Sequence, residues 1–136
     1  MITLDDIVDI IEANVGEGYD RCIRVLLGCV ALVKSHLPDV GIEALSVAEK
    51  YWLEQSLSSD QLEAERIKCW NYLDERGAST NTQDKEYCAL RAVICLLHAQ
   101  QPSDDIGELI EFFLEMVDSI TNDLALVDKT VRKFLN

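Results

Sequence analysis

The chain has 136 residues, of which 12 are Lys or Arg and 25 are Asp or Glu, so its formal net charge is −13 at pH 7. This length predicts one domain spanning residues 1–136, and a hydrophobic content of 49% is too high for a disordered chain. The acidity argues against nucleic-acid and anionic-membrane binding, because both need clustered Lys and Arg. Composition therefore predicts a soluble acidic domain and allows a basic protein partner.

Apolar residues recur at helical spacing, and no segment alternates apolar and polar residues as a strand does. A first helix is expected to begin at a capping box made by Thr3 and Asp6 and to end before Gly16. A second helix is expected over residues 19–37, because the residue before a proline is pushed out of helical geometry. Its nearly all-apolar run over residues 25–33 predicts the most buried helix of the protein.

A third helix is expected over residues 42–55. Its inward face is predicted to consist of Leu45, Ala48, Trp52 and Leu53. Ser58 and Gln61 predict a second capping box, which begins a fourth helix that Gly77 ends. A polar loop is expected over residues 78–82.

A fifth helix is expected over residues 83–100, with the same buried character as the second. Ser103 is expected to cap a sixth helix that reaches residue 118 or beyond, and a seventh helix is expected over residues 122–135. Six to seven helices with short connections predict an all-α fold, a single-domain antiparallel helical bundle.

The cysteines and the N-terminal residues both indicate a cytoplasmic protein. Five cysteines form no CxxC pair, and two pairs of them are seven residues apart on apolar helix faces. Buried free thiols are therefore expected. Acids stand where a signal peptide would carry basic residues, and the longest apolar stretch is too short to span a bilayer.

Catalytic and metal-binding motifs are missing from the sequence. His36 and His98 belong to no Glu-x-x-His or His-x-x-x-His pattern, and no glycine-rich phosphate loop occurs. A nucleophilic pair of Cys95 and His98, three residues apart on a helix, is one alternative. The other is a core cysteine beside a helix-end histidine. We expect no enzyme activity, no cofactor and no metal.

The most informative feature is a run of eight acids between Pro102 and Lys129 without one Lys or Arg. Five of them step by four and three residues along one helix face: Asp104, Glu108, Glu111, Glu115 and Asp118. Such like charges destabilise a helix, so this stripe is locally unfavourable. Two interpretations stay open: a solvated face, or a surface that orients a basic partner. In the first helix Asp5, Asp9 and Glu12 also share a face.

Phe112 and Phe113 stand beside the acidic stripe. One is expected to pack inward, whereas the other is either an exposed anchor or a second core residue. The predicted partner-binding set is Asp104, Glu108, Glu111, Phe112, Glu115 and Asp118.

The middle of the chain carries three recognisable segments. They are Pro38-Asp39-Val40-Gly41, then Glu43-Ala44-Leu45-Ser46-Val47-Ala48-Glu49-Lys50-Tyr51-Trp52, then Ser58-Ser59-Asp60-Gln61-Leu62-Glu63-Ala64-Glu65-Arg66. With Arg91-Ala92-Val93 in a later helix, this part of the chain, about residues 25–98, resembles a helical family of immunity proteins from bacterial polymorphic toxin systems (family five of the immunity series).

The resemblance implies a non-catalytic protein that binds and blocks a toxin encoded beside it. Many such toxins are nucleases with basic clefts, so a cognate toxin with a basic surface is the implied partner. A helical adaptor or regulatory subunit of a cytosolic assembly is the alternative function. The sequence leaves the oligomeric state open.

Overall fold

Helical periodicity and capping signals account for the helices of this fold. In the computed structural model, which describes residues 1–78 and 80–135, the chain forms seven α-helices and three short helical turns, with no strand in this part. The α-helices are α1 (Leu4–Val15), α2 (Tyr19–Cys29), α3 (Asp39–Glu49), α4 (Ser59–Glu75), α5 (Lys85–Ile94), α6 (Ile106–Thr121) and α7 (Leu124–Leu135). The predicted all-α, single-domain helical bundle is confirmed.

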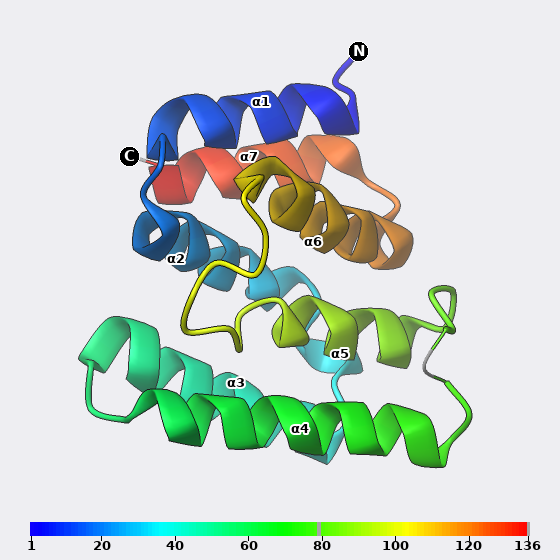
Figure 1. The fold of residues 1–136 in the computed structure, drawn as a ribbon. Coiled ribbons are helices and arrows are strands. Elements are labelled where there is room, and N and C mark those ends of the chain that lie inside the picture. Colours follow the sequence, from blue (N-terminus) through cyan, green and yellow to red (C-terminus); the bar gives the residue numbers. More distant parts are fainter. Residues whose placement is uncertain (79, 136) are drawn as a thin grey trace.

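The helices are arranged in two groups joined through the centre (Figure 1). α1 packs on α6 and α7 at one end of the molecule, while α3 and α4 form a helical pair at the other end. α2 packs on α7, and α5 packs on α6 and α3, so these two helices link the groups. The core runs through all seven helices and includes the fully buried Phe113, Ile23 and Leu90.

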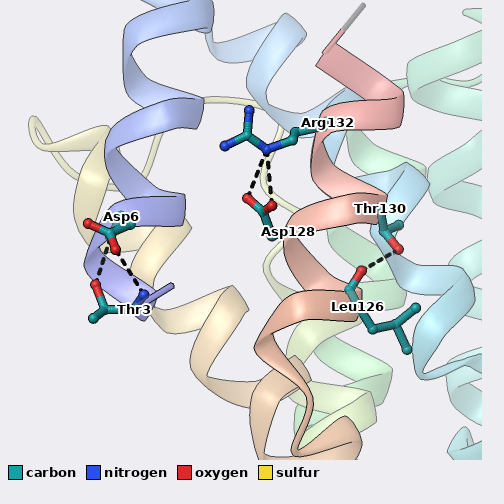
Figure 2. Close-up of polar contacts among 6 residues, drawn as sticks. All are labelled: Thr3, Asp6, Leu126, Asp128, Thr130 and Arg132. Atoms are coloured by element: carbon teal, nitrogen blue, oxygen red, sulfur yellow. Dashed lines mark hydrogen bonds and ion pairs between the residues drawn. The ribbon is translucent and has the colours of Figure 1, made fainter. Parts of the chain in front are cut away.

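Both predicted capping boxes are confirmed. The Asp6 backbone N–H donates to Thr3 Oγ1 at 3.2 Å, and the Thr3 N–H donates to Asp6 Oδ2 at 2.9 Å (Figure 2). Ser58 and Gln61 make the same reciprocal pair at the start of α4. Gly77 follows α4 with a φ of 62°, as predicted for the residue that ends this helix.

The second predicted helix is shorter than expected. α2 ends at Cys29 and continues as two 3₁₀ turns, Val30–Leu32 and Lys34–His36. Residues i and i+3 eclipse in a 3₁₀ turn, so Val30 and Val33 are both buried while Ala31 is exposed. The 3₁₀ geometry therefore keeps the side chains of Val30 and Val33 on the same buried side of the chain.

The third predicted helix begins earlier and ends differently. α3 starts directly after Pro38, and residues Lys50–Glu54 form a π-helical turn. Leu45, Ala48 and Trp52 are buried as predicted, but the inward placement of Leu53 was wrong, since Leu53 is 57% exposed. The wider π turn changes the rotation per residue, which sends Trp52 into the core and Leu53 outward.

The ends of the last three helices also differ from the prediction. The fifth helix was expected over residues 83–100 but covers only Lys85–Ile94. α7 begins at Leu124 rather than at residue 122, because Asn122 adopts a left-handed conformation with φ 48° that ends α6. Near the end of α7, Arg132 Nε donates to both carboxylate oxygens of Asp128 (Figure 2).

Two aromatic side chains hold the segment that follows α5. The Trp52 indole Nε1–H donates to the Leu96 carbonyl at 2.8 Å in the protein interior, and the Tyr19 hydroxyl donates to the His98 carbonyl at 2.7 Å. The Tyr19 and Trp52 rings meet edge to face at 5.8 Å. These two bonds tie the segment that follows the end of α5 at Ile94 to side chains from other parts of the chain.

Arg91 fixes the connection between α4 and α5. This buried side chain donates through its guanidinium to the carbonyls of Ala78 and Asn81 at 3.2 and 3.1 Å. The predicted polar loop over residues 78–82 is therefore anchored at two points. Residue 79 of that loop lies outside the described residues. No helix in the described part of the chain combines the length and apolar character needed to cross a membrane.

Replacing Trp52 by Phe is expected to destabilise the protein strongly. The substitution removes the indole N–H and leaves the buried Leu96 carbonyl without its donor, so the free energy of unfolding should fall by about 2–4 kcal/mol. Chemical denaturation measures this change. Trp70→Phe is the control, because the exposed Trp70 donates no such bond and should change stability by less than about 0.5 kcal/mol.

Candidate functional site

The candidate site begins at the first turn of α6. Asp105, not the predicted Ser103, caps this helix, since Asp105 Oδ1 accepts from the Gly107 N–H at 2.9 Å. Ser103 lies two residues before this cap and contacts both Asp105 and Glu108. The Ser103 hydroxyl accepts from the Asp105 N–H and donates to Glu108 Oε2, both at 3.2 Å. The Ser103 hydroxyl therefore holds the first exposed carboxylate of α6 in place.

The predicted acidic stripe lies mostly at the surface. Asp104 is exposed in the connection before α6, Glu108, Glu111 and Glu115 are exposed on α6, and Asp118 is half-buried. Phe113 is fully buried, whereas Phe112 is 36% exposed. Phe113 is therefore a core residue, whereas Phe112 is partly exposed at the surface.

A groove forms where α1 crosses the first half of α6. It has a volume of about 390 Å³, and we call it the acidic groove. Its lining residues are Asp5, Val8, Asp9, Glu12, Asp105, Gly107, Glu108 and Glu111. The structure therefore brings the acidic face of α1 to Glu108 and Glu111, while Asp104, Glu115 and Asp118 lie outside the groove lining.

Glu12 lies close to the first turn of α6 at Gly107. A Cβ atom at Gly107 would lie 2.6 Å from Glu12 Oε1, so a side chain at this position would make the end of the Glu12 side chain shift. The N-terminal end of a helix carries partial positive charge, which favours a carboxylate there. Glu12 thus has a structural reason for its position.

Within residues 1–78 and 80–135, no carboxylate of the acidic groove forms an ion pair. In residues 1–78 and 80–135 the ion pairs are Arg66–Glu63, Lys68–Glu65 and Arg132–Asp128. None of them involves α1 or α6. No group of three His, Cys, Asp or Glu side chains in the same part of the chain is placed to hold a metal ion.

A second depression lies beside the acidic groove, and we call it the apolar hollow. Its volume is about 260 Å³, and it lies between α4, α5, α6 and the connection before α6. Its lining residues are Trp70, Arg91, Ile94, Cys95, His98, Pro102, Ser103, Glu108, Leu109 and Phe112. Glu108 lines both depressions, so the two are adjacent at this residue of α6.

Cys95 and His98 line this hollow but do not have the properties of a nucleophile and its base. Burial raises the pKa of Cys95 to about 12, so the thiol stays protonated at neutral pH. An Arg66 guanidinium nitrogen lies 2.9 Å from His98 Nδ1, which must accept this bond, and burial together with Arg66 lowers the pKa of His98. All five cysteines are free and buried, as the sequence predicted.

No family model, curated protein or solved structure matches this chain. The resemblance to immunity proteins therefore rests on the sequence segments alone and stays a prediction.

Sequence reasoning missed part of both surfaces. The shared face of Asp5, Asp9 and Glu12 was visible in the sequence, but its place opposite Glu108 follows from the packing of α1 on α6. Trp70 and Phe112 line the same hollow, and no local pattern in the sequence links these two residues. Both omissions concern contacts between residues far apart in the chain.

Replacing Glu115 by Gln is expected to stabilise the protein slightly at neutral pH. Partial burial and the neighbouring Glu111 carboxylate raise the pKa of Glu115, so the ionised form is less favourable in the folded state than in the unfolded chain. Removing this charge should raise the unfolding free energy by a few tenths of a kcal/mol, about the size of a like-charge pair.

The gain should disappear at acidic pH, because Glu115 then becomes protonated in the wild type and no longer repels Glu111. Urea denaturation of the wild type and of Glu115→Gln, from neutral pH to the acidic range in which carboxylates titrate, measures the gain and its loss. Glu17→Gln, in an exposed loop, is the control and should show no gain. A gain for Glu115→Gln that does not depend on pH would contradict this explanation.

Proposed function

We propose that this protein is an immunity protein that neutralises a cognate bacterial toxin by binding it through the surface formed by α1 and α6. One observation carries the proposal: exposed carboxylates from two helices meet in one groove next to a partly exposed Phe112, and no ion pair within residues 1–78 and 80–135 involves them. The partial sequence resemblance supports the same function. On this proposal the protein acts in the cytoplasm as a stoichiometric inhibitor without catalysis.

The charge of the surface suits a basic partner. Six carboxylates line the acidic groove, and the whole chain has a formal net charge of −13. Such a field speeds the encounter with a positively charged protein and aligns it on approach. The carboxylates of Glu108 and Glu111 are placed to meet Lys or Arg side chains on that protein. A toxin with a basic substrate cleft would present them.

Co-expression tests the function directly. The reading frame immediately upstream of this gene is induced in a laboratory bacterium with and without this protein, and survivors are counted. We expect the upstream product alone to kill and this protein to restore growth. A harmless upstream product, or killing that this protein does not relieve, would argue for the adaptor alternative.

Charge reversal tests the site. The triple variant Glu108→Lys, Glu111→Lys, Glu115→Lys is expected to bind the cognate toxin at low salt with an association rate about tenfold lower than that of the wild type. The difference should shrink as salt is raised to about 0.5 M, because salt screens the steering field. Stopped-flow or surface-based kinetics measure both rates.

The control variant carries the same change in net charge elsewhere. Glu43→Lys, Glu49→Lys, Glu54→Lys places three lysines at exposed positions of α3 and of the π turn that follows it, at the opposite end of the molecule from α1 (Figure 1). We expect this control to slow association much less. Equal slowing by both variants would show that net charge alone matters and that α6 is not the binding site.

A further inference from the structure

The apolar hollow has the shape of a receptor for part of a partner molecule. We propose that it receives one apolar side chain, aromatic or branched aliphatic, that stands next to a Lys or Arg on the partner polypeptide. This inference rests on the proposed function, because it names the local chemistry of the toxin segment that the acidic surface would hold.

The walls of the hollow resemble the centre of a protein–protein interface. Trp70 comes from α4 and Phe112 from α6, and each remains 36% exposed although large aromatic side chains are costly to leave in water. Leu109, Ile94 and Pro102 add to these rings, and most of the surface inside the hollow is apolar. Exposed aromatic rings that border a concave pocket are typical of the residues that dominate binding energy.

The size of the hollow indicates a single side chain rather than a small molecule. Its volume of about 260 Å³ lies below the range of about 300–1,000 Å³ found for drug-sized ligands and cofactors. A cavity of about 150 Å³ is enough for a benzene ring, so one aromatic or branched aliphatic side chain fits with room for its backbone approach.

Charged side chains around the hollow favour a particular residue type next to the inserted apolar side chain of the partner. Glu108 is exposed at the junction with the acidic groove, and the Ser103 hydroxyl holds its carboxylate there. Arg91, the one guanidinium in the lining, donates to the backbone carbonyls of Ala78 and Asn81 and lies 5.4 Å from the Trp70 ring. Glu108 therefore places an exposed carboxylate at the rim beside Phe112 and Leu109, and a cation next to the inserted side chain complements it.

The two tryptophans make a sharp test, because each gives one indole N–H signal in a nitrogen–proton correlation spectrum. Trp70 borders the hollow, while Trp52 is buried and bonded to Leu96. The probe is the dipeptide acetyl-Lys-Phe-amide at millimolar concentration. We expect the Trp70 signal to move and the Trp52 signal to stay in place.

Two further dipeptides separate the apolar and the charged parts of the proposal. Acetyl-Lys-Ala-amide should leave the Trp70 signal unmoved, because it lacks a side chain that fills the hollow. Acetyl-Glu-Phe-amide should bind about threefold more weakly at low salt than acetyl-Lys-Phe-amide, with the difference lost at high salt. Glu108→Gln should abolish this preference for Lys without abolishing the response to Phe.

A matched pair of variants tests the position. Phe112→Ala should remove the response of Trp70, whereas Leu126→Ala, which truncates an exposed apolar residue on α7, should leave it unchanged. Equal movement of both indole signals, no movement at all, or loss of the response in Leu126→Ala would overturn the proposal. So would a Trp70 signal that shifts with protein concentration alone, since a second copy of the chain would then fill the hollow.

The dipeptide experiment is independent of the toxin. Failure to bind the dipeptide overturns the hollow as a receptor while leaving a positive rescue result intact. Conversely, dipeptide binding in the absence of any rescue keeps the receptor and rejects the toxin as its partner.

Discussion

The buried hydrogen bond from the Trp52 indole to the Leu96 carbonyl holds the start of the connection on which the proposed binding surface depends. The bond from Tyr19 to the His98 carbonyl holds the same connection after α5 has ended at Ile94. The connection that follows contributes Pro102 and Ser103 to the apolar hollow and Asp105 to the acidic groove. A longer α5 would remove this connection, and with it the shape of both depressions.

Glu108 shows how one residue joins the two parts of the surface. Its carboxylate accepts from the Ser103 hydroxyl, and its side chain borders both the groove and the hollow. A partner that inserts an apolar side chain would therefore bring any adjacent cation to a carboxylate that is already oriented. Because the Glu108 side chain is held before binding, less of its conformational freedom is lost on association.

Features that depend on neighbouring residues were predictable from the sequence, whereas features that depend on packing were not. The caps at Thr3 and Ser58 and the end of α4 at Gly77 follow from local hydrogen bonding and backbone geometry, and all three are confirmed. The π turn that exposes Leu53 and the early end of α5 result from contacts with distant segments. For the same reason the acids of α6 were predictable as exposed, but their meeting with α1 was not.

On the proposed function, the arrangement of acids on α6 serves binding to a basic partner, and neither stability nor solubility requires it. Each like-charge pair lowers the free energy of unfolding by only a few tenths of a kcal/mol, against a total of about 5–15 kcal/mol. Stability therefore neither requires nor excludes this arrangement of acids. Solubility depends on net charge and would be served equally by dispersed acids. Burial and the neighbouring Glu111 carboxylate raise the pKa of Glu115, so its ionised form is unfavourable in the free protein, and a partner's cation at this position would offset that cost. A surface that is slightly unfavourable alone and favourable when complexed gains affinity from that difference.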